Sequence, residues 1–116
     1  MASMYALTCD LSLIADEIAS TLKEKHSSTL CLDHTNFVGE TSTFRVDTYQ
    51  VLNLYWRGYV TINVYFFRPD MAKDELRVKV ALFSSYWKNS TRLMEKLQRE
   101  LHAIILAHGG TEMVEE

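Results

Sequence analysis

Residues that could carry acid–base or metal chemistry are few and poorly grouped in this chain. His34 follows Asp33, and Glu40 comes shortly after them in the same polar stretch. A histidine beside carboxylates could act as a general base or supply part of a metal site. One histidine with flexible acids makes an incomplete site, however, so a solvated loop is the preferred interpretation of these residues.

The other reactive side chains form no recognisable site either. His102 and His108 lie six positions apart on a predicted helix, whereas metal ligands on one helix face are spaced by three or four. The Ser84-Ser85 pair has no identifiable partner base, so it gives no basis for a nucleophile. We therefore expect no catalysis, no metal site and no cofactor.

We expect a cytoplasmic protein, because the sequence contains neither a membrane-spanning run nor a signal pattern. Cys9 and Cys31 are the only cysteines, and their distant positions suit small buried hydrophobic residues better than a redox or metal pair. No apolar run approaches the ~20 residues that span a bilayer, and Asp10, Asp16 and Glu17 interrupt any signal pattern at the start. The net charge of -3 argues against a global nucleic-acid field.

Hydropathy spacing predicts the elements that position any site. Apolar residues alternate with polar ones through most of the chain, and two segments change to helical spacing. The predicted elements are strands over 4–9, 29–33, 44–55, 59–67 and 76–83, helices over 11–25 and 90–108, and a loop over 34–42. Gly109 and Gly110 supply a helix stop, and residues 111–116 are expected to be a disordered acidic tail.

This order predicts an α+β fold in a single domain over residues 1–110. It has a five-stranded curved antiparallel sheet with two helices packed on one face, in the order β-α-β-β-β-β-α. The turn before Gly58 sets which residues share a face. A three-residue loop over 56–58 pairs Leu52 with Ile62 and gives Gly58 a positive φ, whereas a two-residue loop would place leucines opposite polar residues.

In that register, the face away from the helices is rich in aromatic residues. Its predicted binding surface is Tyr49, Tyr55, Tyr59, Asn63, Tyr65, Arg77, Lys79 and Phe83. This number of aromatic rings on one solvated face is larger than the scattered exposure of single residues explains. It favours a surface that binds a partner or a ligand. The alternative is β-propensity alone, because aromatic and β-branched residues stabilise sheets through cross-strand pairs.

The order of strand, helix, four strands and helix resembles the half-repeat of the TATA-binding-protein-like fold, and more loosely the helix-grip domains. The resemblance covers nearly the whole chain and rests on element order, so it carries over no functional residue. Such folds include nucleic-acid binders, ligand binders and enzymes, so the resemblance leaves function open.

The sequence therefore predicts a binding or assembly module that acts through the tyrosine-rich face, as a homodimer or with another protein. One alternative is that single-stranded nucleic acid stacks its bases on the tyrosines. The negative net charge of the chain argues against it, and this face carries only two cations, Arg77 and Lys79. Another is a small apolar ligand held between the sheet and the last helix.

Overall fold

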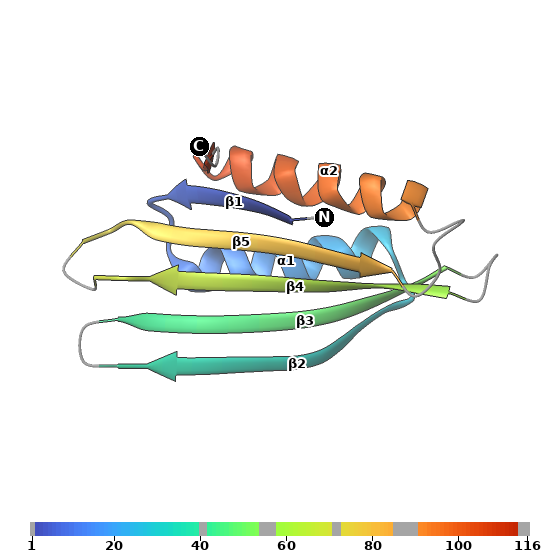
Figure 1. Ribbon diagram of the computed structural model, residues 1–116, viewed down its shortest axis with the longest axis horizontal. Coiled ribbons are helices and arrows are strands. Elements are labelled where there is room, and N and C mark those ends of the chain that lie inside the picture. The colour runs from blue at the N-terminus through green and yellow to red at the C-terminus, as the bar shows by residue number, and fades with distance from the viewer. Residues whose placement is uncertain (1, 40–41, 54–57, 71–72, 85–90, 114–116) are drawn as a thin grey trace.

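The computed structural model describes residues 2–39, 42–53, 58–70, 73–84 and 91–113. Six antiparallel strands form one curved sheet in the order β2-β3-β4-β5-β1-β6 (Figure 1). The strands are β1 (Ala2–Leu7), β2 (Thr29–Val38), β3 (Thr43–Asn53), β4 (Gly58–Arg68), β5 (Leu76–Ser84) and β6 (Thr111–Met113). The α+β class, the antiparallel sheet and the order of the first seven elements are confirmed.

Helix α1 (Leu11–Lys25) forms where the apolar spacing predicts it. The Asp10 side chain caps its start by accepting a hydrogen bond from the Ser12 backbone N–H at 3.3 Å. The buried stripe is Ile14, Ala15, Ile18 and Leu22. This stripe fixes which side of α1 faces the sheet.

Helix α2 (Thr91–Ala107) buries Leu97, Leu101 and Ile105 along one side. Gly109 takes a φ of 85°, and the Gly110 N–H donates to the Ile105 carbonyl at 2.9 Å. Glycine adopts that left-handed conformation without strain, so the predicted helix stop is confirmed.

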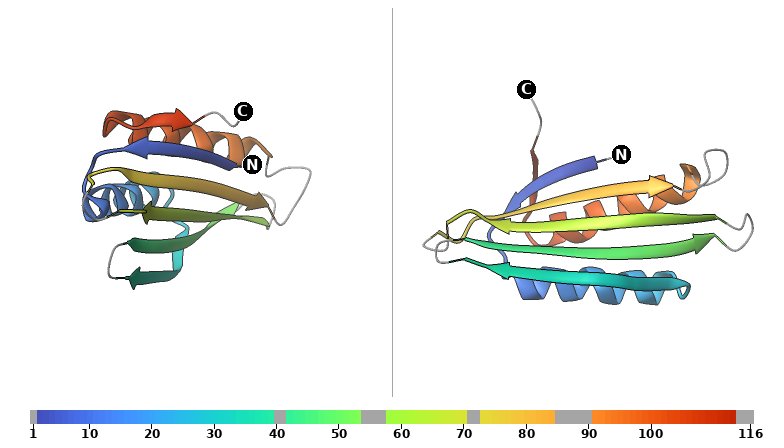
Figure 2. Two further views of the ribbon diagram at one scale, coloured as in Figure 1. Left: turned by 60° about the vertical axis from the view of Figure 1, so that its left-hand side comes forward. Right: turned by 60° about the horizontal axis from the view of Figure 1, so that its bottom comes forward.

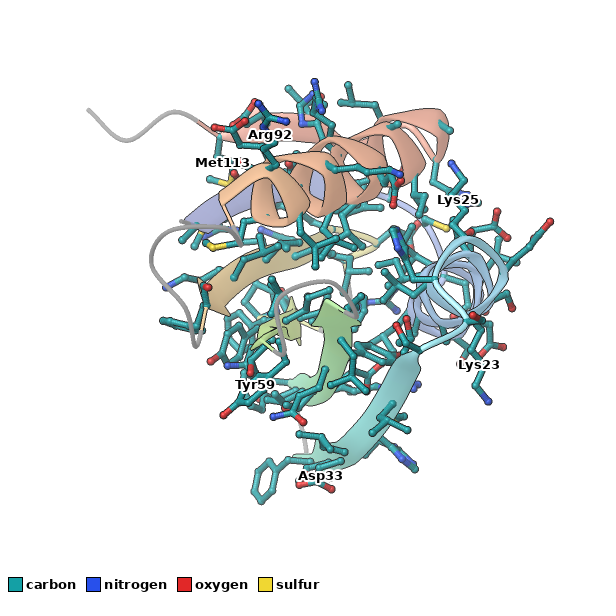
Figure 3. The ribbon with its side chains drawn as sticks, turned by 90° about the vertical axis from the view of Figure 1, so that its right-hand side faces the viewer. Lys23, Lys25, Asp33, Tyr59, Arg92 and Met113 are labelled. Carbon is teal, nitrogen blue, oxygen red and sulfur yellow. The ribbon has the colours of Figure 1, made fainter. Side chains whose placement is uncertain are left out.

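Both helices cover the same face of the sheet (Figure 2). Val60, Ile62, Val64 and Phe66 of β4 are fully buried beneath them, as are Leu76 and Val78 of β5. His26 at the end of α1 contacts Glu100 of α2, with Nε2 and Oε2 2.7 Å apart. Among the described elements, no helix covers the opposite face, and Figure 3 shows Tyr59 on the side of the sheet away from α1. We call this second face the open face.

The predicted register between β3 and β4 is wrong. Leu52 pairs with Tyr59 and not with Ile62, and Asn53 pairs with Gly58. The connection is therefore residues 54–57, so Gly58 is a strand residue and not the third loop position. An odd shift turns every β3 side chain over, which buries Tyr49 and Val51 under the helices and exposes Leu52. Leu54, Tyr55 and the rest of 54–57 lie outside the described residues.

The sheet is also larger than the sequence predicts. Strand β2 continues to Val38, through a segment predicted as a loop, and pairs with β3 along its length with a bulge between Cys31 and Asp33. Thr111–Met113, predicted as part of a disordered tail, forms β6 against β1. Over the described residues, the sheet therefore has six strands and not five.

Candidate functional site

One end of the open face combines aromatic rings with positive charge. Tyr65 and Phe67 on β4 lie directly across from Lys79 and Arg77 on β5. Phe44 on β3 faces Phe67 from the other side. Alternate residues of a strand share a face, so the sequence of these strands brings all five side chains together. We call this group, with Met4, the cationic end.

The rings of the cationic end form a cluster around a surface hollow. The Phe44 ring centroid lies 6.4 Å from that of Tyr65 and 6.4 Å from that of Phe67. Such tilted and edge-on arrangements are favourable for aromatic pairs. The hollow has a volume of about 310 Å³ and is lined by Met4, Phe44, Tyr65, Phe67, Arg77 and Lys79.

The two cations of this hollow have little counter-charge. Arg77 Nε lies 3.5 Å from Glu75 Oε1, with both side chains nearly half exposed, and an exposed pair of that kind contributes little. Within the described ranges, Lys79 makes no ion pair. The hollow therefore offers apolar walls beside a positive potential.

The other end of the open face is apolar and carries no charge among the described residues. Leu30, Leu52, Tyr59 and Phe83 are each 39–55% exposed there. Leu52 and Tyr59 are direct cross-strand partners, and Phe83 lies opposite Thr61 on the neighbouring strand. We call Leu30, Leu52, Tyr59 and Phe83 the apolar end. Tyr59 and Phe67 are eight residues apart on β4, which separates the two ends by roughly 27 Å.

Between the two ends, the open face carries small and polar side chains. Asn63 Oδ1 accepts a hydrogen bond from the Thr48 hydroxyl at 2.9 Å. Ala81, the cross-strand neighbour of Asn63, is buried. The bond joins Asn63 of β4 to Thr48 of β3. These polar side chains lie between the cationic end and the apolar end, which we therefore treat as two surfaces.

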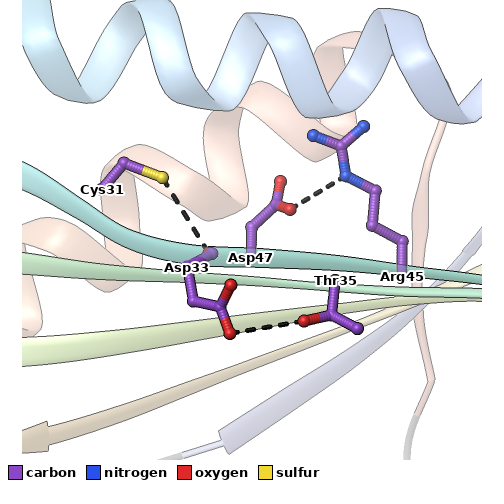
Figure 4. A network of polar contacts seen from close by, with 5 residues as sticks. All are labelled: Cys31, Asp33, Thr35, Arg45 and Asp47. Atoms are coloured by element: carbon purple, nitrogen blue, oxygen red, sulfur yellow. Dashed lines mark hydrogen bonds and ion pairs between the residues drawn. The ribbon is translucent and has the colours of Figure 1, made fainter.

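A second polar group lies on the helix face, beneath α1. Asp47 is 1% exposed, and its Oδ1 accepts a hydrogen bond from Arg45 Nε at 2.9 Å (Figure 4). Its other oxygen has no hydrogen-bond partner among the described groups and is closed off from solvent. Burial and the nearby Asp47 charge both raise the pKa of the Tyr49 phenol. The charged pair and Tyr49 therefore form a polar part of the core.

A hollow of about 340 Å³ opens beside this polar group, between α1 and strands β2 and β3. Lys23, Cys31, His34, Arg45 and Tyr49 are among its lining residues. In the part of the chain that the structure describes, no carboxylate is hydrogen-bonded to His34, so a general base held by an acid is not formed. No group of three or more metal-ligating side chains occurs among the same residues.

The structure brings together six of the eight predicted binding residues on one face. Tyr59, Asn63, Tyr65, Arg77, Lys79 and Phe83 all lie on the open face. Tyr49 does not, because the register places it in the core, and Tyr55 lies outside the described residues.

Sequence reasoning missed Leu52 and Phe44 at the two ends of the face. Both residues belong to the same alternating set of β3 positions, which the incorrect loop length assigned to the helix face.

None of the helices in the described ranges is long and apolar enough to cross a membrane. Compared with models of known protein families and with curated proteins, the chain matches none.

Proposed function

We propose that this protein is a non-catalytic binding module that associates with a second copy of itself through the open face of its sheet. The observation that carries the proposal is the apolar end, where Leu30, Leu52, Tyr59 and Phe83 are all substantially exposed on adjacent strands. Contiguous apolar surface of this kind is typical of association sites.

Charge favours a second copy as the occupant of the apolar end. Interface cores are depleted of charged residues, and the four residues of this end carry none. A two-fold axis through this end packs the same four side chains of both copies against one another, and apolar side chains pack in such a contact without the repulsion that like charges would cause. Two copies of the chain, each with a net charge of -3, repel each other. A contact made by uncharged residues keeps this repulsion small.

The size of the patch indicates weak and reversible association. A stable interface buries ~800 Å² from each partner, and smaller ones belong to transient complexes. Four side chains supply less than that area, so we expect a dimer that forms over the micromolar range.

The two free thiols, Cys9 and Cys31, favour a reducing compartment, which is why the proposal places the protein in the cytoplasm.

Light scattering across low to high micromolar concentration tests the proposal. The wild type should move from monomer to dimer mass as concentration rises. The double variant Leu52→Thr with Phe83→Thr should remain monomeric, because threonine keeps strand propensity and removes the apolar contact.

Phe37→Thr is the matched control for this experiment. Phe37 is 67% exposed on edge strand β2, near the cationic end and away from the proposed contact. This control should dimerise like the wild type. A wild type that stays monomeric throughout, or a control that loses the dimer equally, would refute association through the apolar end.

A further inference from the structure

The cationic end of the open face differs from the apolar end in charge. It surrounds a hollow of about 310 Å³ and carries Arg77 and Lys79, whereas the four residues of the apolar end carry no charge. The six lining residues of the hollow come from β1, β3, β4 and β5. Volumes near 300 Å³ lie at the lower limit of sites that hold small molecules.

The register places the positive charges of Lys79 and Arg77 within the open face and not at an edge of the sheet. Lys79 has Tyr65 as its partner on one side and Met4 on the other, and Arg77 lies between Phe67 and Ala6. Strand β5 has neighbours on both sides, so its two cations project from within the face. Both side chains are exposed there, so their charges are accessible to a ligand on the open face.

The same arrangement argues against a second copy as occupant of the hollow. A two-fold axis through the hollow would bring the Arg77 and Lys79 of one copy close to those of the other, and like charges facing each other are destabilising. Glu75 supplies one exposed counter-charge for the two cations. A ligand that brings its own negative charge removes the imbalance.

We propose that the hollow binds a small organic anion with a flat aromatic body, such as an aromatic carboxylate, sulfonate or phosphate ester. Its rings lie against Phe44, Tyr65 and Phe67, whose tilted arrangement offers both faces and edges. Its anionic group lies beside Lys79 and Arg77, where charge-assisted hydrogen bonds form. The inference shares the open face with the proposed function and does not require the dimer.

A pair of fluorescent probes tests the charge and the rings separately. 8-Anilinonaphthalene-1-sulfonate has fused rings and a sulfonate, and N-phenyl-1-naphthylamine has the same rings without it. The sulfonate probe should bind one site per chain, about tenfold more tightly than the neutral probe. Added salt should reduce that preference.

Substitution of one cation then locates the site. Lys79→Gln should reduce the preference for the sulfonate probe, since only Arg77 then remains beside it, and leave binding of the neutral probe unchanged. Lys96→Gln, on the exposed side of α2, is the matched control and should keep the preference. Equal affinity of the two probes for the wild type, or an unchanged preference in Lys79→Gln, would overturn the assignment.

Nucleic acid shares the combination of ring and anion, so a third measurement separates the two sources. Thymidine monophosphate and a twelve-residue thymidine oligonucleotide should displace the sulfonate probe with similar affinity per site, because only two cations serve the hollow. An oligonucleotide that binds at least a hundredfold more tightly would overturn the small-molecule assignment in favour of single-stranded nucleic acid.

The double variant Leu52→Thr with Phe83→Thr keeps this result independent of the dimer. It should bind both probes as the wild type does, even where it is monomeric. Loss of probe discrimination with an intact dimer would contradict this inference alone, and the converse would contradict the proposed function alone.

Discussion

At the scale of single residues, the polar group beneath α1 is the feature of the core that hydropathy does not anticipate. Asp47 and Arg45 occupy inward positions of β3, next to the inward Tyr49. Removing an aspartate from water costs several kcal/mol unless it is paired, and the Arg45 contact at 2.9 Å provides that pairing. We therefore expect that replacing Asp47 or Arg45 alone lowers the free energy of unfolding by more than the pair contributes to it.

The buried phenol of Tyr49 gives this region a measurable dependence on pH. Its pKa is raised above the ordinary value of 10.0 by burial first and by the Asp47 charge second. Above about pH 10 the unfolded chain releases this proton and the folded chain keeps it. The unfolded state then binds fewer protons, so the free energy of unfolding falls as pH rises.

Tyr49→Phe should therefore reduce this alkaline loss of stability, by up to about 1.4 kcal/mol per pH unit. Tyr5, whose pKa burial also raises, should leave a residual decline in the variant. Urea unfolding between about pH 9 and pH 11 measures the effect. Tyr59→Phe, on the exposed face, serves as the control, and a slope in Tyr49→Phe identical to that of the wild type would contradict the buried position of Tyr49.

At the scale of elements, the sequence predicts what strong periodicity encodes. Both helices, the inward residues of β4 and β5 and the glycine stop after α2 are recovered, because each has a wide apolar stripe or a special backbone requirement. The far half of β2 is missed because its residues are exposed on both faces, so no alternation marks it. Strand β6 spans only Thr111–Met113, too short for any pattern.

Loop length is where the prediction of the site fails. Apolar and aromatic residues occupy both faces of β3, with Tyr49 and Val51 on one and Leu52 on the other, so hydropathy does not decide between the two registers. The parity of the 54–57 connection decides it, and one residue more or less exchanges the faces. The β4 and β5 residues of the site are recovered because their alternation is unambiguous.

The register can be tested with two adjacent substitutions in β3. Val51→Ala should cost roughly 2 kcal/mol in unfolding free energy, since Val51 is 1% exposed in the core. Leu52→Ala should cost less than about 0.5 kcal/mol when measured at monomeric concentrations, because Leu52 is 40% exposed. Denaturant melts that show the larger loss in Leu52→Ala would support the register predicted from sequence and refute the one described.

At the scale of the whole molecule, the two faces of the sheet differ in burial and composition. The helix face is packed with the buried side chains of both helices and holds the fold together. The open face carries an apolar end and a cationic end, separated by the Thr48–Asn63 hydrogen bond. We propose that this division lets self-association and ligand binding occur on one sheet without competition between them.

We propose that the apolar end of the open face, and not the helix surface, meets a second copy of the chain. Hydroxyl-radical footprinting of the wild type at low and high micromolar concentration can distinguish these two surfaces. We predict that labelling of Tyr59 and Phe83 falls at high concentration, while labelling of Phe37 and of Leu13 on α1, both exposed, does not change. Equal labelling of Tyr59 and Phe83 at both concentrations, or protection of Leu13 instead, would contradict the account.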